Sequence, residues 1–197
     1  MPCGSAVSAP MLIHADAMPA QPWRNGGGHT RELLTWPAGT RDWRLRISLA
    51  QVDRAGPFSA FPGIERWFSV IDGAGVRLSL AGRELTLRPG HEPLNFSGDL
   101  PVFCTPIDGP TTDLNLMHAG GRTAMLRAQS GLPWHSSWPQ RGLYARIAGQ
   151  WRAAGMPPAS LPAHCLLWLD QAADGEWSFI ADHPGTDTPG IWLSFKP

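Results

Sequence analysis

Short segments of alternating apolar and polar residues recur along this chain, and glycine or proline separates them. The clearest is DWRLRISLAQV (Asp42–Val52), in which the two kinds of side chain fall on opposite faces of an extended strand. One face carries Trp43, Leu45, Ile47 and Leu49, and the other carries Arg44, Arg46, Ser48 and Ala50. The chain also holds 22 Gly and 20 Pro, residues that break helices and populate turns. No amphipathic helix longer than about three turns is visible, so the sequence predicts an all-β sandwich or barrel.

Other strands follow the same pattern and lie between turn signals. They are expected at Thr30–Trp36, Arg66–Ile71, Val76–Leu80, Glu84–Leu87, Val102–Thr105, Leu114–Met117, Cys165–Asp170 and Ile191–Phe195. Ala81 and Gly82 are expected to close a hairpin between two of these strands. After Gly121 the alternation weakens, and Leu143–Trp151 is ambiguous. The first part of the chain therefore carries the stronger signal.

The size and charge of the chain limit its organisation and its partners. The 197 residues fit one large domain or two small ones, and 43 % hydrophobic residues are enough to form a core. Lys plus Arg and Asp plus Glu both number 16, and no basic stripe is visible, so nucleic acid is not expected as a partner. No apolar run is long enough to span a bilayer, and the first residues do not resemble a signal peptide. We therefore expect a cytoplasmic protein without a membrane partner.

The three cysteines do not form a recognisable framework. They lie at Cys3, Cys104 and Cys165, an odd number without CxxC spacing. This arrangement argues against disulfides or a structural zinc site and suits a reducing compartment. We expect small buried or unreactive thiols.

Three consecutive glycines, Gly26–Gly28, lie in QPWRNGGGHTREL (Gln21–Leu33) just before a predicted strand. The dinucleotide fingerprint requires a further glycine where Arg31 stands, and the P-loop requires Gly-Lys-Ser/Thr before a helix, so neither phosphate site is expected. An esterase oxyanion loop is excluded because the chain has no G-x-S-x-G nucleophile elbow. Two interpretations remain: a tight turn between strands, or a pocket wall whose N–H groups face a ligand.

The polar face of the strand that contains Arg46 also permits two interpretations, because the sequence does not decide which face points inward. In a one-sided sheet Arg46 and Ser48 are solvated, whereas in a barrel that packs its apolar face outward they line the lumen. The same question applies to Glu32, and to Asp113 and Asn115 in TDLNLM. A guanidinium in a partly dry cavity is well suited to a carboxylate.

The histidines form no H-x-H, H-E-x-x-H or 2-His-1-carboxylate motif. They lie at His14, His29, His91, His118, His135, His164 and His183. His29, beside the glycines, and His91, in RPGHEPLN, remain open as metal ligands or bases, although a lone histidine is more often a surface or structural residue. We therefore expect no bound metal and no cofactor.

Five sequence blocks follow one another in the first 117 residues. They are PWRNGGGHTREL (Pro22–Leu33), WRLRISLAQV (Trp43–Val52), GPFSAFPGIER (Gly56–Arg66), IDGAGVRLSL (Ile71–Leu80) and FSGDLPVFCTPIDGPTTDLNLM (Phe96–Met117). In this order they resemble the HutD/Ves family of bacterial bicupins. The resemblance implies an all-β bicupin, with two cupin-like β-barrels or sandwiches packed together and without the metal motif of metal-binding cupins. It places an N-terminal barrel at residues 10–120 and a C-terminal cupin-like half at residues 121–197, between which strands can be exchanged.

The resemblance also implies a function. Family members resemble small-molecule binders, the HutD branch is tied to histidine utilisation, and the Ves branch is linked to cold or environmental stress. We therefore expect a regulator of histidine utilisation that binds a small carboxylate such as formylglutamate. One alternative is a metal-independent isomerase or hydrolase acting on a small acid in the same pocket, with Glu32 or His29 as general base. Another is a scaffold whose Trp-rich second half binds a protein, and exposed edge strands are compatible with a homodimer.

The family resemblance favours the pocket interpretation of the glycines and of the polar strand face. Arg46 becomes the expected carboxylate anchor, and Glu32 is expected to hold Arg46 or to accept an N–H of the ligand. No catalytic residue is assigned. The expected ligand-binding residues are Asn25, Gly26, Gly27, Gly28, Glu32, Arg46, Ser48, Phe61, Arg66 and Asn115, with Phe58 beside Phe61 at the mouth.

Overall fold

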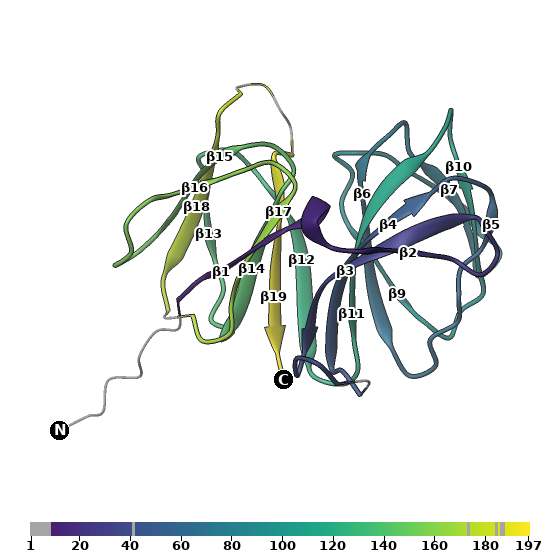
Figure 1. Ribbon diagram of the computed structural model, residues 1–197, viewed down its shortest axis with the longest axis horizontal. Helices are drawn as coiled ribbons and strands as arrows, with labels where there is room; N and C mark the ends of the chain where they lie inside the picture. Colours follow the sequence, from purple (N-terminus) through teal and green to yellow (C-terminus); the bar gives the residue numbers. More distant parts are fainter. Residues whose placement is uncertain (1–8, 41, 173, 184, 186–187) are drawn as a thin grey trace. The chain divides into compact units, whose positions relative to one another are not determined.

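Antiparallel β-sheets, divided between two compact units, make up this protein (Figure 1). The computed structural model describes residues 9–40, 42–172, 174–183, 185 and 188–197. Ala15–Met125 form the N-terminal unit, and strand β1 with Leu126–Lys196 forms the C-terminal unit. Apart from one 3-10 turn, η1 (Ala15–Ala17), the regular structure of the described residues consists of strands. The all-β prediction is therefore confirmed.

The N-terminal unit holds a six-stranded and a four-stranded sheet. The larger sheet has the order β2-β3-β4-β11-β6-β9, and the smaller sheet has the order β5-β10-β7-β8. The strands are β2 (Ala20–Pro22), β3 (Gly28–Trp36), β4 (Leu45–Val52), β5 (Gly56–Pro57), β6 (Glu65–Asp72), β7 (Val76–Leu80), β8 (Arg83–Leu87), β9 (Leu94–Ser97), β10 (Val102–Pro106) and β11 (Thr111–His118).

The C-terminal unit repeats the two-sheet plan. One sheet has the order β1-β17-β14-β19-β12, and the other has the order β13-β18-β15-β16. The strands are β1 (Met11–His14), β12 (Arg122–Ala128), β13 (Pro133–His135), β14 (Gln140–Ala145), β15 (Gly149–Ala153), β16 (Ala159–Leu161), β17 (Cys165–Leu169), β18 (Glu176–Ala181) and β19 (Gly190–Lys196). Each unit is thus a pair of antiparallel sheets, the architecture of a β-sandwich.

The core of the N-terminal unit follows from the alternation of its strands. In β7, Val76, Leu78 and Leu80 are buried, whereas Arg77 between them is exposed. These three side chains join a cluster from β4, β6, β9 and β10 that contains Val52, Phe68, Val70, Phe96, Val102 and Cys104. Burial of such side chains stabilises a fold by roughly 1.5–3 kcal/mol each.

The strands expected from alternation are all present, and five of the nine are longer than expected by one or two residues. The strand expected at Asp42–Val52 begins only at Leu45, and that expected at Leu114–Met117 extends over Thr111–His118. Leu80 pairs with Arg83, so the expected hairpin through Ala81 and Gly82 is confirmed. The ambiguous segment Leu143–Trp151 divides into the end of β14 and the start of β15. Within the described residues no helix is long and apolar enough to cross a membrane.

Candidate functional site

A cavity of about 590 Å³ lies in the N-terminal unit. Its wall combines aromatic side chains, amides, hydroxyls and guanidinium groups. The lining residues are Gln21, Pro22, Trp23, Arg24, Asn25, Thr30, Arg46, Ser48, Ala50, Pro57, Phe58, Ser59, Phe61, Arg66, Asn115 and Met117. Concave sites of this volume, apolar with a few polar groups, are typical of small-molecule binding.

The register of the large sheet places the polar groups in this cavity. Ser48 of β4 pairs with Asn115 of β11, and Arg46 pairs with Met117, so these four side chains share one face of the sheet. Ser48 is 2 % exposed and Asn115 is 3 % exposed. The face of β4 that carries Arg46 therefore lines a cavity and is not a solvated surface. Leu45 and Ile47 on the opposite face are also buried, which is why both faces of β4 exclude water.

Arg66, in β6, is the most deeply buried cation of the cavity, with 6 % exposure. Its Nη2 donates a hydrogen bond of 3.0 Å to Oδ1 of Asn115. Its guanidinium carbon lies 5.1 Å, 5.6 Å and 5.2 Å from the ring centroids of Phe58, Phe61 and Phe96. Its Nε has no hydrogen-bond partner among the described residues. A buried cation held by rings and one neutral amide favours an additional anionic partner.

The charge of Arg66 persists in this environment. Burial and, to a lesser extent, the charge of Arg46 lower the pKa of Arg66 to about 10, while Asp113 acts in the opposite direction. The guanidinium therefore remains protonated at neutral pH.

Arg46 differs from Arg66 because it already has a carboxylate partner. Its Nε lies 2.8 Å from Oε2 of Glu32, and the two side chains are 16 % and 40 % exposed. A β-bulge between Glu32 and Leu34 interrupts the pairing of β3 with β4 at this point. Glu32 reaches Arg46 but is not among the residues that line the cavity. The expected contact between Glu32 and Arg46 is present, and it neutralises the cation that we expected to anchor the ligand.

The three glycines build the turn between β2 and β3 and do not line the cavity. Trp23 N–H donates to the carbonyl of Gly28 over 2.9 Å, and Gly27 N–H donates to Oδ1 of Asn25 over 3.0 Å. Gly26 has a φ of +66°, the left-handed conformation that glycine adopts readily. The Gly27 carbonyl accepts hydrogen bonds from the N–H groups of Asp53 and Arg54. These pairings favour the tight-turn interpretation of the run, and the pocket-wall interpretation stays a prediction that ligand binding by Gly27→Ala tests.

The sequence-derived site residues thus separate into two groups. The structure brings Asn25, Arg46, Ser48, Phe58, Phe61, Arg66 and Asn115 together around the cavity. Gly26, Gly27, Gly28 and Glu32 lie outside its lining. Residues that the sequence analysis missed include Trp23, Arg24, Thr30, Ser59 and Met117. Met117 follows Asn115 at the strand period of two, whereas the loop residues Trp23, Arg24 and Ser59 carry no periodic signal.

One buried acid on this face, Asp113 in β11, is absent from the expected ligand-binding residues. Asp113 is fully buried, and neither carboxyl oxygen has a hydrogen-bond partner among the described residues. Burial raises its pKa well above the ordinary value, although the charge of Arg66 opposes this shift. The carboxyl group is therefore held toward its neutral form.

The sequence leaves His29 and His91 open as metal ligands or bases. Neither His29 nor His91 lines the cavity. Among the residues that the structure describes, no three His, Cys, Asp or Glu side chains lie close enough together to hold a metal ion.

Cys104 and Cys165 are both buried, and burial raises their pKa values to about 12 and about 11.

The interior of the C-terminal unit is filled by aromatic rings. Trp134 and Trp192 stack at 4.8 Å, and Trp177 meets Trp151 edge to face at 5.1 Å. The guanidinium of the buried Arg141 lies 4.9 Å from the Trp177 ring. These contacts form an aromatic core around Trp177.

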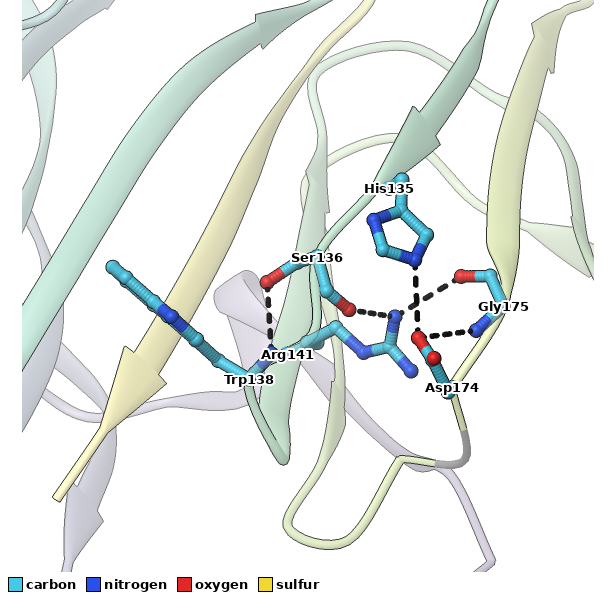
Figure 2. Close-up of polar contacts among 6 residues, drawn as sticks. All are labelled: His135, Ser136, Trp138, Arg141, Asp174 and Gly175. Atoms are coloured by element: carbon cyan, nitrogen blue, oxygen red, sulfur yellow. Dashed lines mark hydrogen bonds and ion pairs between the residues drawn. The ribbon is translucent and has the colours of Figure 1, made fainter.

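Arg141 is held by the protein itself, as Figure 2 shows. Its Nη1 donates to the carbonyl oxygens of Ser136, over 2.6 Å, and Gly175, over 3.1 Å. Beside it, Nε2 of His135 lies 3.0 Å from Oδ1 of Asp174, which also accepts the Gly175 N–H. The buried arginine of the C-terminal unit therefore closes a loop network, whereas that of the N-terminal unit faces a cavity.

Comparisons with known proteins agree with this architecture. The family model described as HutD matches residues 15–185. Protein Ves from Citrobacter koseri is 33 % identical over 136 residues, which are 68 % of this chain and 71 % of that protein. An uncharacterized 21.2 kDa protein from the hutC 3' region of Pseudomonas putida is 34 % identical over 112 residues, which are 56 % of this chain and 59 % of that protein.

Solved structures show the same relationship. A conserved protein of unknown function from Pseudomonas aeruginosa PAO1 has a TM-score of 0.83 and 31 % identity, covering 96 % of this chain and all of that chain. HutD from Pseudomonas fluorescens SBW25 has a TM-score of 0.81 and 26 % identity, covering 95 % and 98 %. Oxalate decarboxylase from Bacillus subtilis, at a TM-score of 0.62 and 10 % identity over 98 % and 78 % of the chains, shares the cupin fold alone. The expected resemblance is confirmed: the chain belongs to the HutD family and has the all-β fold of a bicupin.

Proposed function

We propose that this HutD-family protein binds a small carboxylate in the cavity of the N-terminal unit and thereby regulates histidine utilisation. The observation that carries the proposal is Arg66, a buried guanidinium that faces the cavity with its Nε unpaired among the described residues. A carboxylate accepts hydrogen bonds from a guanidinium in a fixed planar geometry. The proposal therefore moves the expected anchor from Arg46 to Arg66.

The charges around the cavity support an anionic ligand. Arg46 is paired with Glu32, so its charge is compensated, whereas the guanidinium of Arg66 has only the neutral Asn115 as a hydrogen-bond partner among the described residues. Arg24, an exposed residue, also lines the cavity and adds a second cation to it. An anion that contacts Arg66 removes the electrostatic cost of burying it.

The other lining groups fit an acylated amino acid. Ser48, Thr30 and Asn25 supply hydroxyl and amide groups, and Phe58 and Phe61 supply apolar surface. An acylamino dicarboxylate such as formylglutamate has one carboxylate for Arg66, a second for Arg24, and an amide for the hydroxyl groups. Two relatives carry hut names, the uncharacterized protein from the hutC 3' region of Pseudomonas putida and HutD of Pseudomonas fluorescens, and these names support the proposed role in histidine utilisation.

Binding experiments with purified protein test this proposal. Thermal unfolding is followed with formylglutamate, glutamate, histidine, urocanate, formate and divalent metals, and hits are titrated by calorimetry. A carboxylate at about 100 times its dissociation constant is expected to stabilise the fold by about 2.7 kcal/mol, a rise of roughly 5–10 °C in the midpoint. Arg66→Ala is expected to weaken binding of that carboxylate roughly 10- to 150-fold, because a charged hydrogen bond contributes roughly 1.5–3 kcal/mol.

Two variants serve as comparisons for Arg66→Ala. Arg83→Ala removes an exposed guanidinium of β8 that lies outside the cavity lining, and it is expected to bind like the wild type. Arg46→Ala is expected to lose less affinity than Arg66→Ala, since Glu32 already compensates Arg46. A shift produced by a divalent metal alone, or equal affinities of Arg66→Ala and Arg83→Ala, would contradict the proposal.

Asp113 favours a second candidate function, a metal-independent isomerase or hydrolase acting on the same acid. Asp113 pairs directly with Ala50 of the cavity lining, and a buried carboxyl group whose pKa is raised can serve as a general acid or base. The test is proton NMR of the bound acid during incubation with the protein. New resonances that disappear with Asp113→Asn support an enzyme, and an unchanged spectrum leaves the binding function.

The proposal keeps the cytoplasmic location and assigns no nucleic-acid or membrane partner. It also includes a homodimer through edge strand β1, whose Met11 and Leu12 are 46 % and 40 % exposed. Light scattering during size-exclusion chromatography is expected to give about twice the chain mass of 21.4 kDa, and the single chain mass would contradict the dimer.

A further inference from the structure

Asp113 lies immediately beside the cavity, on the face of β11 that also carries Asn115. It pairs directly with Ala50 of β4, which lines the cavity. Along β11 it lies two residues before Asn115, which pairs with Ser48. Directly paired residues of antiparallel strands project their side chains from the same face. The Asp113 carboxyl is therefore a neighbour of the cavity wall, although it is fully buried.

The strands packed around Asp113 provide little positive charge to compensate its ionised carboxylate. On β6 Asp113 pairs with Val70, where the register of β11 with β6 shifts between Thr112 and Asp113. Arg66, also on β6, is the cation whose charge acts on Asp113, and the charge of Asp113 in turn acts on the thiol of Cys104 on β10. The pKa of Cys104, about 12, keeps that thiol neutral. Asp113 is thus a buried acid that faces one cation and apolar surface.

The protonation state of Asp113 sets the charge behind the cavity wall. Arg46 and Glu32 form a pair of zero net charge. With Asp113 ionised, its charge and that of Arg66 also sum to zero, and with Asp113 neutral the charge of Arg66 is left uncompensated. The site therefore attracts an anion more strongly in the second state.

We propose that the carboxylate ligand enters the cavity together with one proton, which Asp113 holds while the ligand compensates Arg66. This inference rests on the function proposed above and assigns Asp113 the role of a positioning residue that acts through Arg66. A bound anion removes the one charge that favours ionised Asp113, so the bound form takes up a proton wherever the unliganded form has lost it. By linkage, the same coupling makes protonation of Asp113 strengthen binding.

The sign of the pH dependence follows from this coupling. Ligand binding raises the pKa of Asp113 above its value in the unliganded protein. Affinity is therefore full below the pKa of the unliganded form and falls as pH rises through it, by up to about tenfold per pH unit. Cys104 and Arg66 do not titrate near neutral pH, because their pKa values are about 12 and about 10.

Titration calorimetry with formylglutamate and with formate between pH 5 and 9.5, in buffers of different ionisation enthalpy, tests the inference. The wild type is expected to take up close to one proton per ligand in the range where its affinity falls. Asp113→Asn, which imitates the neutral acid, is expected to bind with no proton uptake and with a flat affinity up to pH 9. Cys104→Ala, which removes the other titratable neighbour, is expected to keep the wild-type pH profile.

The outcomes separate this inference from the function on which it rests. Absence of binding by the wild type at every pH contradicts the proposed function and this inference with it. Binding with the same pH profile in the wild type and in Asp113→Asn, or without proton uptake at any pH, contradicts the role of Asp113 alone.

A ligand-free readout guards against a variant that is merely misfolded. Because burial raises the pKa of Asp113 above the unfolded value, its contribution to stability is present below the unfolded pKa, near 4, and is lost as pH rises toward the native pKa. Asp113→Asn has no titrating group at this position, so its stability does not fall with pH for this reason. The ratio of the unfolding equilibrium constants of wild type and Asp113→Asn is expected to grow by up to about tenfold per pH unit in that range. A constant ratio would overturn the inference.

Discussion

Trp177→Ala is expected to lower the free energy of unfolding by about 3–5 kcal/mol, the usual cost of removing a large buried aromatic side chain. Trp177 is 3 % exposed and lies at the centre of the C-terminal core. Its ring meets those of Trp134, Trp151 and Trp192 at 5.8 Å, 5.1 Å and 6.3 Å. It also supports the guanidinium of Arg141, so the variant leaves both a cavity and a less compensated buried cation.

Guanidinium chloride unfolding, followed by near-ultraviolet circular dichroism, measures this loss. Trp177→Phe keeps an aromatic ring beside Arg141 and is expected to lose less than half as much free energy. A loss below about 1 kcal/mol for Trp177→Ala would mean that the tryptophans do not form the rigid core described here. Because this core lies outside the N-terminal cavity, Trp177→Phe is also expected to bind the carboxylate like the wild type.

The fold could be predicted wherever one face of a strand is buried and the other is not. In β7 the buried Val76 and Leu78 alternate with exposed or half-buried residues, and the predicted bounds match the observed strand. β14 gave no such signal, because all six of its residues are buried and the alternation disappears. β2 and β13 are three-residue strands that contain proline, which the rules for strand prediction reject. β18 was not among the expected strands, although its buried Trp177 and Phe179 have the spacing of two that indicates a strand.

The candidate site could be predicted where it depends on strand parity. Arg46, Ser48 and Asn115 lie on one face because β4 and β11 pair without a shift over this part of their length. Glu32 pairs with Ser48 and therefore shares its face of the sheet, but its carboxylate lies against Arg46 and it is not part of the cavity lining. Trp23 and Arg24 lie in a turn, where neighbouring side chains have no fixed period.

The choice between Arg46 and Arg66 required three-dimensional contacts. Both residues were expected in the pocket, and Arg46 was the expected carboxylate anchor. Only the structure shows that Glu32 lies 2.8 Å from Arg46, whereas three phenylalanine rings surround Arg66. The isolation of Asp113 likewise depends on the burial of β11 by strands distant in sequence.

Gly28→Ala is expected to destabilise the N-terminal unit by about 3 kcal/mol or more, because a side chain at this position meets backbone. A Cβ on Gly28 would overlap the carbonyl oxygen of Gln51 in the adjacent strand β4 and would lie 3.2 Å from the Trp23 ring. Gly28 is also the first residue of β3 and pairs with Val52. The clash can be relieved only by separating the two strands, which disturbs the sheet that carries Arg46 and Ser48.

Gly27→Ala is the matched control, one residue earlier in the same run. A Cβ on Gly27 would meet only the side chain of Asn25, at 3.2 Å from Oδ1, and a side chain can move. Thermal and urea unfolding are therefore expected to show a loss below about 1 kcal/mol for Gly27→Ala. The pair of variants also separates the two interpretations of the glycine run. If the glycines were needed for close approach of a ligand, Gly27→Ala would fold normally and lose affinity for the carboxylate; if they are needed for the turn and for strand pairing, Gly27→Ala binds like the wild type and Gly28→Ala loses the fold.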